Sequence, residues 1–223
     1  MKKIILACVL GAFMGVMTGC WDNNNDSPSQ YLELGKTGTA EDGDPMVVTD
    51  SDLTLKLTDY SENLDFDEVE RVLLKYELDE EGGDEDDYDY IVNVIRIQEV
   101  VTKDIVEINE ENRDTIGTDP LFLNDIWIAG GYLNIDFSFY GDDKTHYINI
   151  VKDPDEQTGE ETEIYLQVRH DDRDDDALQR YRGLMSFYLD SLQVEGAGKV
   201  DLIFEDQDFY SSPFTGFELE YEY

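Results

Sequence analysis

The sequence predicts an all-β protein in which a small barrel is followed by an antiparallel β-sandwich. Apolar residues alternate with polar ones over many short segments, which is the period of strands with one buried face. Gly, Asp, Asn and Pro separate these segments, and no long stretch has the period of an amphipathic helix. With 14 Tyr, 10 Phe and 40% apolar residues, the chain is too hydrophobic to be a disordered acidic tail.

The N-terminus has the pattern of a bacterial lipoprotein signal. Lys2 and Lys3 precede an apolar run over 4–17 that is too short to span a bilayer. Small residues then lead to Cys20, as a lipid-modifying signal peptidase requires. We predict a signal peptide over 1–19 and acyl chains such as palmitate on Cys20. The alternative is an ordinary secretory signal. Two or three acyl chains anchor a protein stably, because each buried methylene contributes about 0.8 kcal/mol.

The composition limits the partners. The formal net charge is −38, with 54 acidic and 16 basic residues. Nucleic acid is excluded, because its phosphates require a Lys/Arg surface. Anionic lipid is disfavoured for the same reason, so we expect membrane contact through the lipid anchor alone. Cys8 leaves with the signal and Cys20 carries lipid, which leaves no thiol for a disulfide, a metal site or a nucleophile.

Residues 20–30 form an acidic, polar tether. Acidic residues close behind the lipidated cysteine resemble the surface-export signal of lipoproteins in Bacteroides-like bacteria, and a plain linker is the alternative. We therefore expect an outer-membrane lipoprotein of the cell envelope, exposed at the cell surface if the tether is an export signal.

The first folded unit is predicted over residues 31–108. About five strands and one short helical turn fit a small barrel. The segments are strands at 31–36, 53–57, 71–78 and 88–101, a helical turn at 65–70, and an acidic hairpin loop at 79–87. The segment 88–101 is almost continuously apolar, so we expect a central strand that is buried on both faces.

A connector over 109–120, rich in turn residues, leads to a second unit over 121–223. About seven strands separated by turns indicate an antiparallel sandwich there. The predicted strands are 133–139, 145–151, 164–168, 183–189, 200–204 and 217–223.

Several stretches of the sequence stand out together, namely Val101–Glu107, Ile126–Ile128, Gly131–Ile135, His146–Val151, Tyr165–His170 and Tyr181–Phe187. In these stretches the chain resembles the NigD-like lipoproteins of the Bacteroidota. The resemblance covers most of 88–223 and extends to the lipobox, and it is thinner over 21–87. It implies an N-terminal OB-fold domain followed by a β-sandwich domain, in agreement with the boundary drawn from turn residues. The family name comes from a bacteriocin-associated gene cluster, and the resemblance implies neither an enzymatic activity nor catalytic residues.

Catalytic motifs are absent from the sequence. There is no nucleophile elbow, no phosphate-binding glycine loop and no zinc-ligand spacing. His146 and His170 lie in or beside predicted strands, where we expect structural roles. The many carboxylates do not single out an acid–base pair. We therefore expect no enzyme, and a glycan-active hydrolase is the least favoured alternative.

Calcium is the inorganic partner that the acidic loops favour most, since it takes several hard oxygens from flexible loops. The best candidates are Asp171, Asp172 and Asp174. Further candidates are Asp84, Asp86, Asp87, Asp153, Asp155, Glu156, Asp175 and Asp176. None has EF-hand spacing, and a solvated acidic loop is the simpler interpretation, so we expect no metal and no cofactor besides the lipid.

Four aromatic residues near predicted loops or strand ends suggest stacking on sugar rings, namely Trp127, Tyr132, Tyr140 and Tyr210. Most other aromatic residues are expected in the core. We thus predict a non-enzymatic binding module for a protein or glycan at the cell surface. The alternative is a bacteriocin-associated or immunity-type lipoprotein that captures a cationic toxin. The ligand, the oligomeric state and the side of the membrane stay open.

Overall fold

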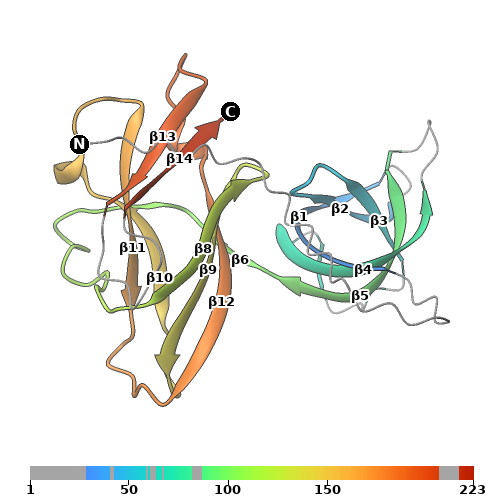
Figure 1. Ribbon diagram of the computed structural model, residues 1–223, viewed down its shortest axis with the longest axis horizontal. Coiled ribbons are helices and arrows are strands. Elements are labelled where there is room, and N and C mark those ends of the chain that lie inside the picture. The colour runs from blue at the N-terminus through green and yellow to red at the C-terminus, as the bar shows by residue number, and fades with distance from the viewer. Residues whose placement is uncertain are drawn as a thin grey trace, which may run out of the picture.

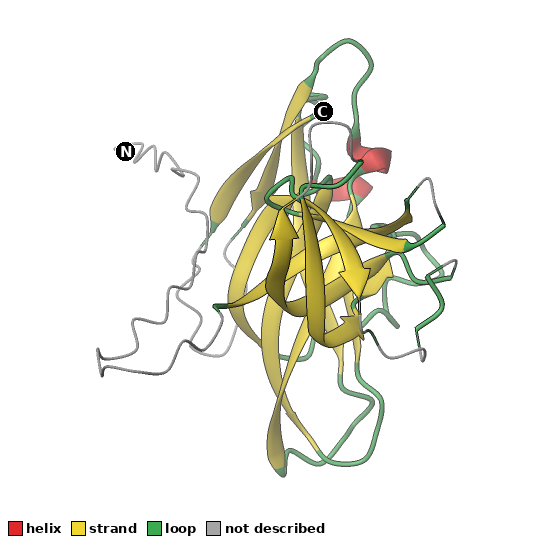
Figure 2. Ribbon diagram, turned by 90° about the vertical axis from the view of Figure 1, so that its right-hand side faces the viewer, coloured by secondary structure: helices red, strands yellow, loops and turns green. Residues whose placement is uncertain are grey.

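A computed structural model describes residues 29–40, 43–58, 60, 64–66, 68–81, 87–205 and 216–223. The predicted signal peptide, Cys20, nearly all of the tether and the tip of the acidic hairpin lie outside these residues. The described chain forms two β-rich lobes side by side (Figure 1), and helix is limited to the short 3-10 turns Pro154–Glu156 and Asp190–Leu192 (Figure 2). None of the described helices has the length and apolar character needed to cross a membrane.

The N-terminal lobe is a closed five-stranded barrel with the order β1-β2-β3-β5-β4. The pair β3–β5 is parallel, and the other neighbours are antiparallel. The prediction of a small barrel is therefore confirmed. Its strands are β1 (Gln30–Thr39), β2 (Pro45–Thr49), β3 (Thr54–Thr58), β4 (Arg71–Glu81) and β5 (Tyr90–Glu99).

The barrel core consists of alternate residues on each strand. Leu55 and Leu57 on β3 face Leu74 and Tyr76 on β4, and all four are at least 97% buried. The backbone amides of Glu68 and Val69 both donate to the carbonyl of Asp65, which is the hydrogen-bonding pattern of the helical turn predicted at 65–70. One local expectation was wrong. Strand β5 is not buried on both faces, since Ile95 is 44% exposed. The physical reason is that one face of every strand in this barrel is the outer surface of the lobe.

The C-terminal lobe packs a five-stranded sheet, β14-β13-β11-β10-β7, against a four-stranded sheet, β6-β12-β9-β8. This confirms the predicted sandwich, although the pairs β6–β12, β7–β10 and β11–β13 are parallel. The strands are β6 (Val101–Lys103), β7 (Val106–Glu107), β8 (Phe122–Ala129), β9 (Tyr132–Gly141), β10 (Tyr147–Lys152), β11 (Glu163–Asp171), β12 (Gln179–Tyr188), β13 (Lys199–Phe204) and β14 (Phe217–Glu222). Alternating residues such as Leu133 and Ile135 from one sheet and Ile150 and Leu202 from the other fill the core.

The chain passes from barrel to sandwich at Val100. Strands β6 and β7 pair with sandwich strands, so residues 101–107 hydrogen-bond with the second lobe rather than with the unit predicted to end at 108. The turn residues that suggested the later boundary follow β7 instead. Asn109 and Asn112 bind backbone amides there and form a local loop.

A polar joint connects the two lobes, and we define it as Asp50, Glu70, Arg71, Tyr132, Asn134 and Tyr188. Arg71 of β4 is only 1% exposed, and it donates to Asp50 in the barrel and to Asn134 Oδ1 in the sandwich, the latter at 3.0 Å. Its guanidinium lies 4.3 Å from the ring centre of Tyr132. These contacts give the described lobes a defined relative position.

Glu70 completes the joint from the barrel side. Its carboxylate accepts hydrogen bonds from the hydroxyls of Tyr132 and Tyr188, each at 2.5 Å. These two bonds lower the pKa of Glu70. The bond to Glu70 also raises the pKa of Tyr188 to about 12, and burial is the main cause of the raised pKa of Tyr132.

Candidate ligand-binding face

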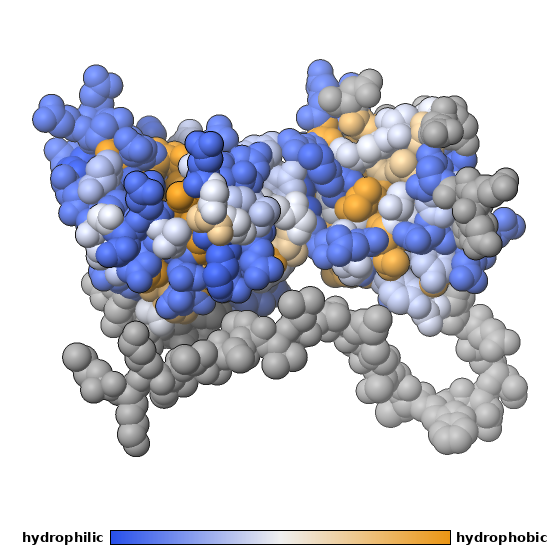
Figure 3. Space-filling model, turned by 90° about the horizontal axis from the view of Figure 1, so that it is seen from above, coloured by the Kyte–Doolittle hydropathy of each residue, from blue (hydrophilic) through white to orange (hydrophobic). Residues whose placement is uncertain are grey.

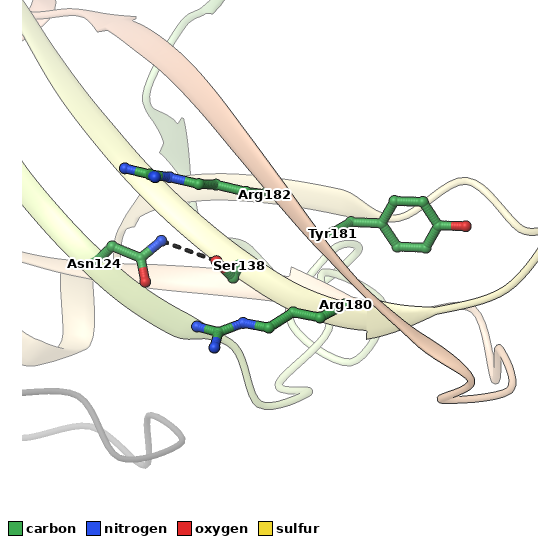
Figure 4. A pocket seen from close by; sticks show the side chains of 5 residues that line it. All are labelled: Asn124, Ser138, Arg180, Tyr181 and Arg182. Atoms are coloured by element: carbon green, nitrogen blue, oxygen red, sulfur yellow. Dashed lines mark hydrogen bonds between the residues drawn. The ribbon is translucent and has the colours of Figure 1, made fainter.

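The outer face of the four-stranded sheet contains a hollow of about 460 Å³. It is lined by Asn124 from β8, Ser138 from β9, and Arg180, Tyr181 and Arg182 from β12. In Figure 4, the two arginine side chains extend toward Asn124 and Ser138, whereas Tyr181 points the other way. This alternation is that of a strand, so the outer face receives Arg180 and Arg182 while the residue between them packs behind the sheet.

A hydrogen-bonded network fixes one side of this hollow. Arg182 Nε donates to the two oxygens of Asp136 at 2.9 and 3.1 Å, and the amide of Asn124 donates to Asp136 and to Ser138 Oγ, both at 2.9 Å. Asn124 lies where β8 shifts register against β9, between Leu123 and Asp125. This bulge places an extra side chain on the strand and aims it at the network. The polar groups are thus held in place by hydrogen bonds within the protein.

The other side of the hollow is aromatic. The guanidinium of Arg180 lies 4.4 Å from the ring centre of Phe122, and the Phe122 ring meets Tyr140 edge-on at 5.8 Å. Tyr140 pairs with Arg180 across β9 and β12 and is 45% exposed. The face therefore offers an accessible aromatic ring beside fixed hydrogen-bonding groups. This is the combination that polar ring-shaped ligands require.

The four aromatic residues singled out from the sequence fall in different places. Only Tyr140 lies beside the hollow. Trp127 lies further along β8, opposite Asn134 and part-buried, while Tyr132 is 4% exposed in the joint. Tyr210 lies outside the described residues. The sequence reasoning missed Asn124, Arg180 and Arg182, although two arginines two positions apart in so acidic a chain were a usable signal.

The two histidines lie in the interior of the sandwich, away from the hollow. His146 Nδ1 is 2.8 Å from His170 Nε2, and His146 Nε2 is 3.2 Å from Asp175 Oδ2. Phe139 stacks on His146 with ring centres 4.2 Å apart, and Tyr181 stacks on the same Phe139. The side chains of His146 and Asp175 are at most 2% exposed. This position fits the structural role that we expect for both rings.

The hydrogen bonds of His170 indicate which of its ring nitrogens carries the proton. His170 Nδ1 lies 3.0 Å from the carbonyl oxygen of Pro120, so it donates, and His170 Nε2 accepts from His146. His146 Nε2 faces the carboxylate of Asp175 at 3.2 Å. Burial lowers the pKa of His170, consistent with a neutral ring there.

Asp175 anchors the loops at this end of the sandwich. Its Oδ2 accepts the backbone N–H of Asp142 at 2.6 Å, and this bond, followed by the contact with His146, lowers its pKa to about 2. The Tyr181 hydroxyl donates to the carbonyl of Asp142 at 3.0 Å. The contacts of Asp175 and Tyr181 with Asp142 therefore connect the ends of β9 and β12, the two strands that carry Tyr140 and Arg180.

The calcium candidates do not converge in the structure. Asp171 and Asp172 accept the N–H groups of Arg173 and Asp174 in tight turns, and the Lys144 ammonium donates to the carbonyls of Arg173 and Asp174. Within the described residues, no three acidic or histidine side chains form a metal-binding group. The other candidates are separated as well. Asp153 and Asp155 pair with Arg113, Glu156 accepts from Gln167, and Asp175 contacts His146. Asp87 and Asp176 are exposed, and Asp84 and Asp86 lie outside the described residues.

A closed barrel followed by a sandwich, with a hollow on an open sheet face, defines a two-lobed all-β protein. The model of the NigD-like C-terminal β-sandwich domain matches residues 104–219, which are 116 of the 223 residues. The chain therefore belongs to the NigD-like family, as the sequence resemblance implied. No curated protein matches the chain.

Solved structures share the whole two-lobed fold. A NigD-like immunity protein from Bacteroides caccae has a TM-score of 0.60 at 19% identity, with 89% of this chain and 99% of that chain covered. A protein of unknown function from Bacteroides vulgatus has a TM-score of 0.69 at 18% identity, with 87% and 91% covered. A candidate lipoprotein from Bacteroides fragilis has a TM-score of 0.61 at 11% identity, with 87% and 99% covered. At these identities the likeness concerns the fold.

Proposed function

We propose that this NigD-like protein is a lipid-anchored binding module of the cell envelope, and that it binds a glycan on the outer face of β8, β9 and β12 without catalysing a reaction. The observation that carries the proposal is the exposed Tyr140 ring beside the fixed network of Asn124, Asp136 and Arg182. A sugar ring has apolar faces that stack on an aromatic ring and hydroxyl groups that need donors and acceptors at its rim.

The anchor belongs to the same proposal. Acyl chains on Cys20 and the tether would hold the barrel near the outer membrane, and the polar joint would fix the sandwich relative to the barrel. The similar fold of a candidate lipoprotein from Bacteroides fragilis supports this placement. Protease treatment of intact cells, compared with lysed cells and with a periplasmic control protein, tests whether the lobes face the outside. Digestion in intact cells with an untouched control supports surface exposure, and full protection supports a periplasmic position.

The glycan proposal is tested by screening the mature chain against immobilised oligosaccharides and measuring the hits by calorimetry. We expect Tyr140→Ala to weaken binding roughly tenfold or more, as for a stacked anchor residue. Tyr147→Ala is the matched control, because Tyr147 is also 45% exposed but lies on β10 in the other sheet. Equal affinities for both variants would show that the hollow is not the binding site.

The second candidate is capture of a cationic toxin, and two observations favour it. The net charge is −38, and a structural neighbour is described as a NigD-like immunity protein. Such capture would depend on many surface carboxylates and would weaken steeply as salt is added. A binding partner whose affinity falls with salt and is unaffected by Tyr140→Ala would favour this role over the glycan.

A further inference from the structure

We infer that the glycan bound in the hollow is acidic, and that Arg180 binds its carboxylate or sulfate group. This inference rests on the proposed function and narrows its ligand to a chemical class. The starting observation concerns charge. The chain has about three acidic residues for every basic one, yet Arg180 has no carboxylate within ion-pair distance among the described residues.

The neighbouring arginine is in the opposite situation. Arg182 is bound through Nε and Nη2 to Asp136, so its charge is balanced within the protein. The hollow therefore contains one compensated and one uncompensated guanidinium. The network around Asp136 alone would provide the hydrogen-bonding groups that a neutral sugar needs. An unbalanced guanidinium is what an anionic substituent requires, because charge-assisted bonds to a planar donor are the strongest that a surface site offers.

Packing keeps Arg180 available for such a bond. Its guanidinium stacks on Phe122, and Phe122 is held edge-on by Tyr140. Stacking uses one face of the guanidinium and leaves its N–H groups free at the edge of the plane, where a carboxylate or sulfate binds in two-pronged fashion. The exposed Tyr140 ring lies beside it across the strand pair. One residue could thus stack on the sugar ring while its neighbour binds the anionic substituent.

The charge of the whole protein gives this pairing an unusual salt dependence. The acidic surface repels an anion at long range, and salt screens that repulsion over about 8 Å at physiological ionic strength. The short contact with Arg180 is screened less. We therefore expect affinity for an acidic oligosaccharide to rise with the first additions of salt, which is the opposite of the behaviour expected for a cationic toxin.

The test uses three probes and the full mature chain. The probes are a galacturonate oligosaccharide, a sulfated galactan oligosaccharide and a neutral galactan oligosaccharide of equal length. We expect binding of at least one acidic probe and at least a tenfold weaker affinity for the neutral one. Arg180→Gln should lower the affinity for the acidic probe roughly ten- to a hundredfold, as for loss of a charge-assisted pair. Comparison of the uronate and sulfate probes identifies the anionic group.

Arg173→Gln is the matched control, because Arg173 is also an exposed arginine near an aromatic ring, that of Tyr147, but lies outside the hollow. It changes the net charge equally and should leave the affinity unchanged. If a neutral probe binds as well as the acidic ones and Arg180→Gln has no effect, the inference is wrong while glycan binding stands. If an acidic peptide binds in place of every oligosaccharide, or if nothing in the wider glycan screen binds, the glycan proposal fails and this inference with it.

Discussion

The guanidinium of Arg71 meets the carboxylate of Asp50 through two hydrogen bonds of 2.6 and 2.9 Å, in a position where the arginine side chain is fully buried. Both residues belong to the barrel, but the same guanidinium also binds Asn134 of the sandwich, whose Oδ1 accepts from Ser186 at 2.7 Å as well. The four-stranded sheet of the sandwich is thereby joined to the barrel by directional hydrogen bonds. Polar contacts of this kind specify an orientation more narrowly than apolar contact does.

We expect Arg71→Met to destabilise the protein by about 3 kcal/mol, because it leaves the part-buried carboxylate of Asp50 without its partner. The measurement is chemical denaturation followed by fluorescence and by limited proteolysis between the lobes. Lys199→Gln removes the exposed pair with Glu220 and should change the midpoint little, since exposed pairs contribute little. An unchanged midpoint for Arg71→Met would mean that the joint does not stabilise the fold.

Glu70 should control the ionisation of Tyr188. The hydrogen bond to Glu70 raises the Tyr188 pKa from its ordinary value of 10.0 to about 12 in the folded protein. The stabilisation is therefore complete below about pH 10 and is lost as the pH rises toward 12. We expect Glu70→Gln to move the ionisation of Tyr188 back toward pH 10, measured as the change in tyrosinate absorbance that Tyr188→Phe removes. A Tyr188 that ionises at an ordinary pH in the unmodified protein contradicts this account.

The sequence predicted most of the strands because their alternation is local. Residues 133–139 and 164–168 show the two-residue period directly, and both lie in strands. Strand β8 escaped prediction because the bulge at Asn124 puts buried Leu123 and Ile126 three positions apart, which breaks the period. Strands β6 and β7 were assigned to the wrong side of the lobe boundary since their partners are distant in sequence.

The candidate site was less predictable than the fold. Arg180 and Phe122 are far apart in the sequence and become neighbours only through the pairing of β8, β9 and β12. No local spacing encodes such a pair. Tyr140 was named from its place near a strand end, but the same reasoning named Tyr132, whose ring lies in the joint. Burial depends on which lobe covers a strand, and that information is absent from a local pattern.

Acid should destabilise the protein through two buried groups of the sandwich, His170 and Asp175. Burial lowers the pKa of His170 below 6.5, and the bonds from Asp142 and His146 lower that of Asp175 from 3.8 to about 2. As the pH falls, each of these two groups therefore takes up its proton at a higher pH in the unfolded chain than in the folded protein. Stability is therefore full above about pH 6.5, decreases below it through His170, and decreases again between about pH 4 and 2 through Asp175. Melting temperatures across this range measure the effect.

Two variants separate the contributions. Asp175→Asn should flatten the decrease below pH 4, because the amide side chain does not titrate there. Because the chain has only two histidines, an NMR titration follows each ring directly, and His146→Asn assigns the signals. We expect His170 to stay neutral at pH values where a free histidine is charged. Titration of His170 at its ordinary value would refute the buried arrangement.

Gly183 marks a place where the sandwich has no room for a side chain. It pairs with Phe137 across β12 and β9, and an added Cβ would lie 2.5 Å from Phe137 Cζ and 2.8 Å from Cε2. The Phe137 ring is 4% exposed and packed in the core, so it cannot move aside without disturbing its neighbours. We expect Gly183→Ala to destabilise the protein by about 1–3 kcal/mol, the usual range for overpacking a core.

Gly38→Ala is the matched control in strand β1, where an added Cβ meets nothing within 4 Å. Alanine there restricts only the unfolded chain, so its effect should be neutral or stabilising by up to about 1 kcal/mol. Equal unfolding midpoints for the two variants would show that the Phe137 ring yields, and that this part of the sandwich is packed less tightly than its burial indicates.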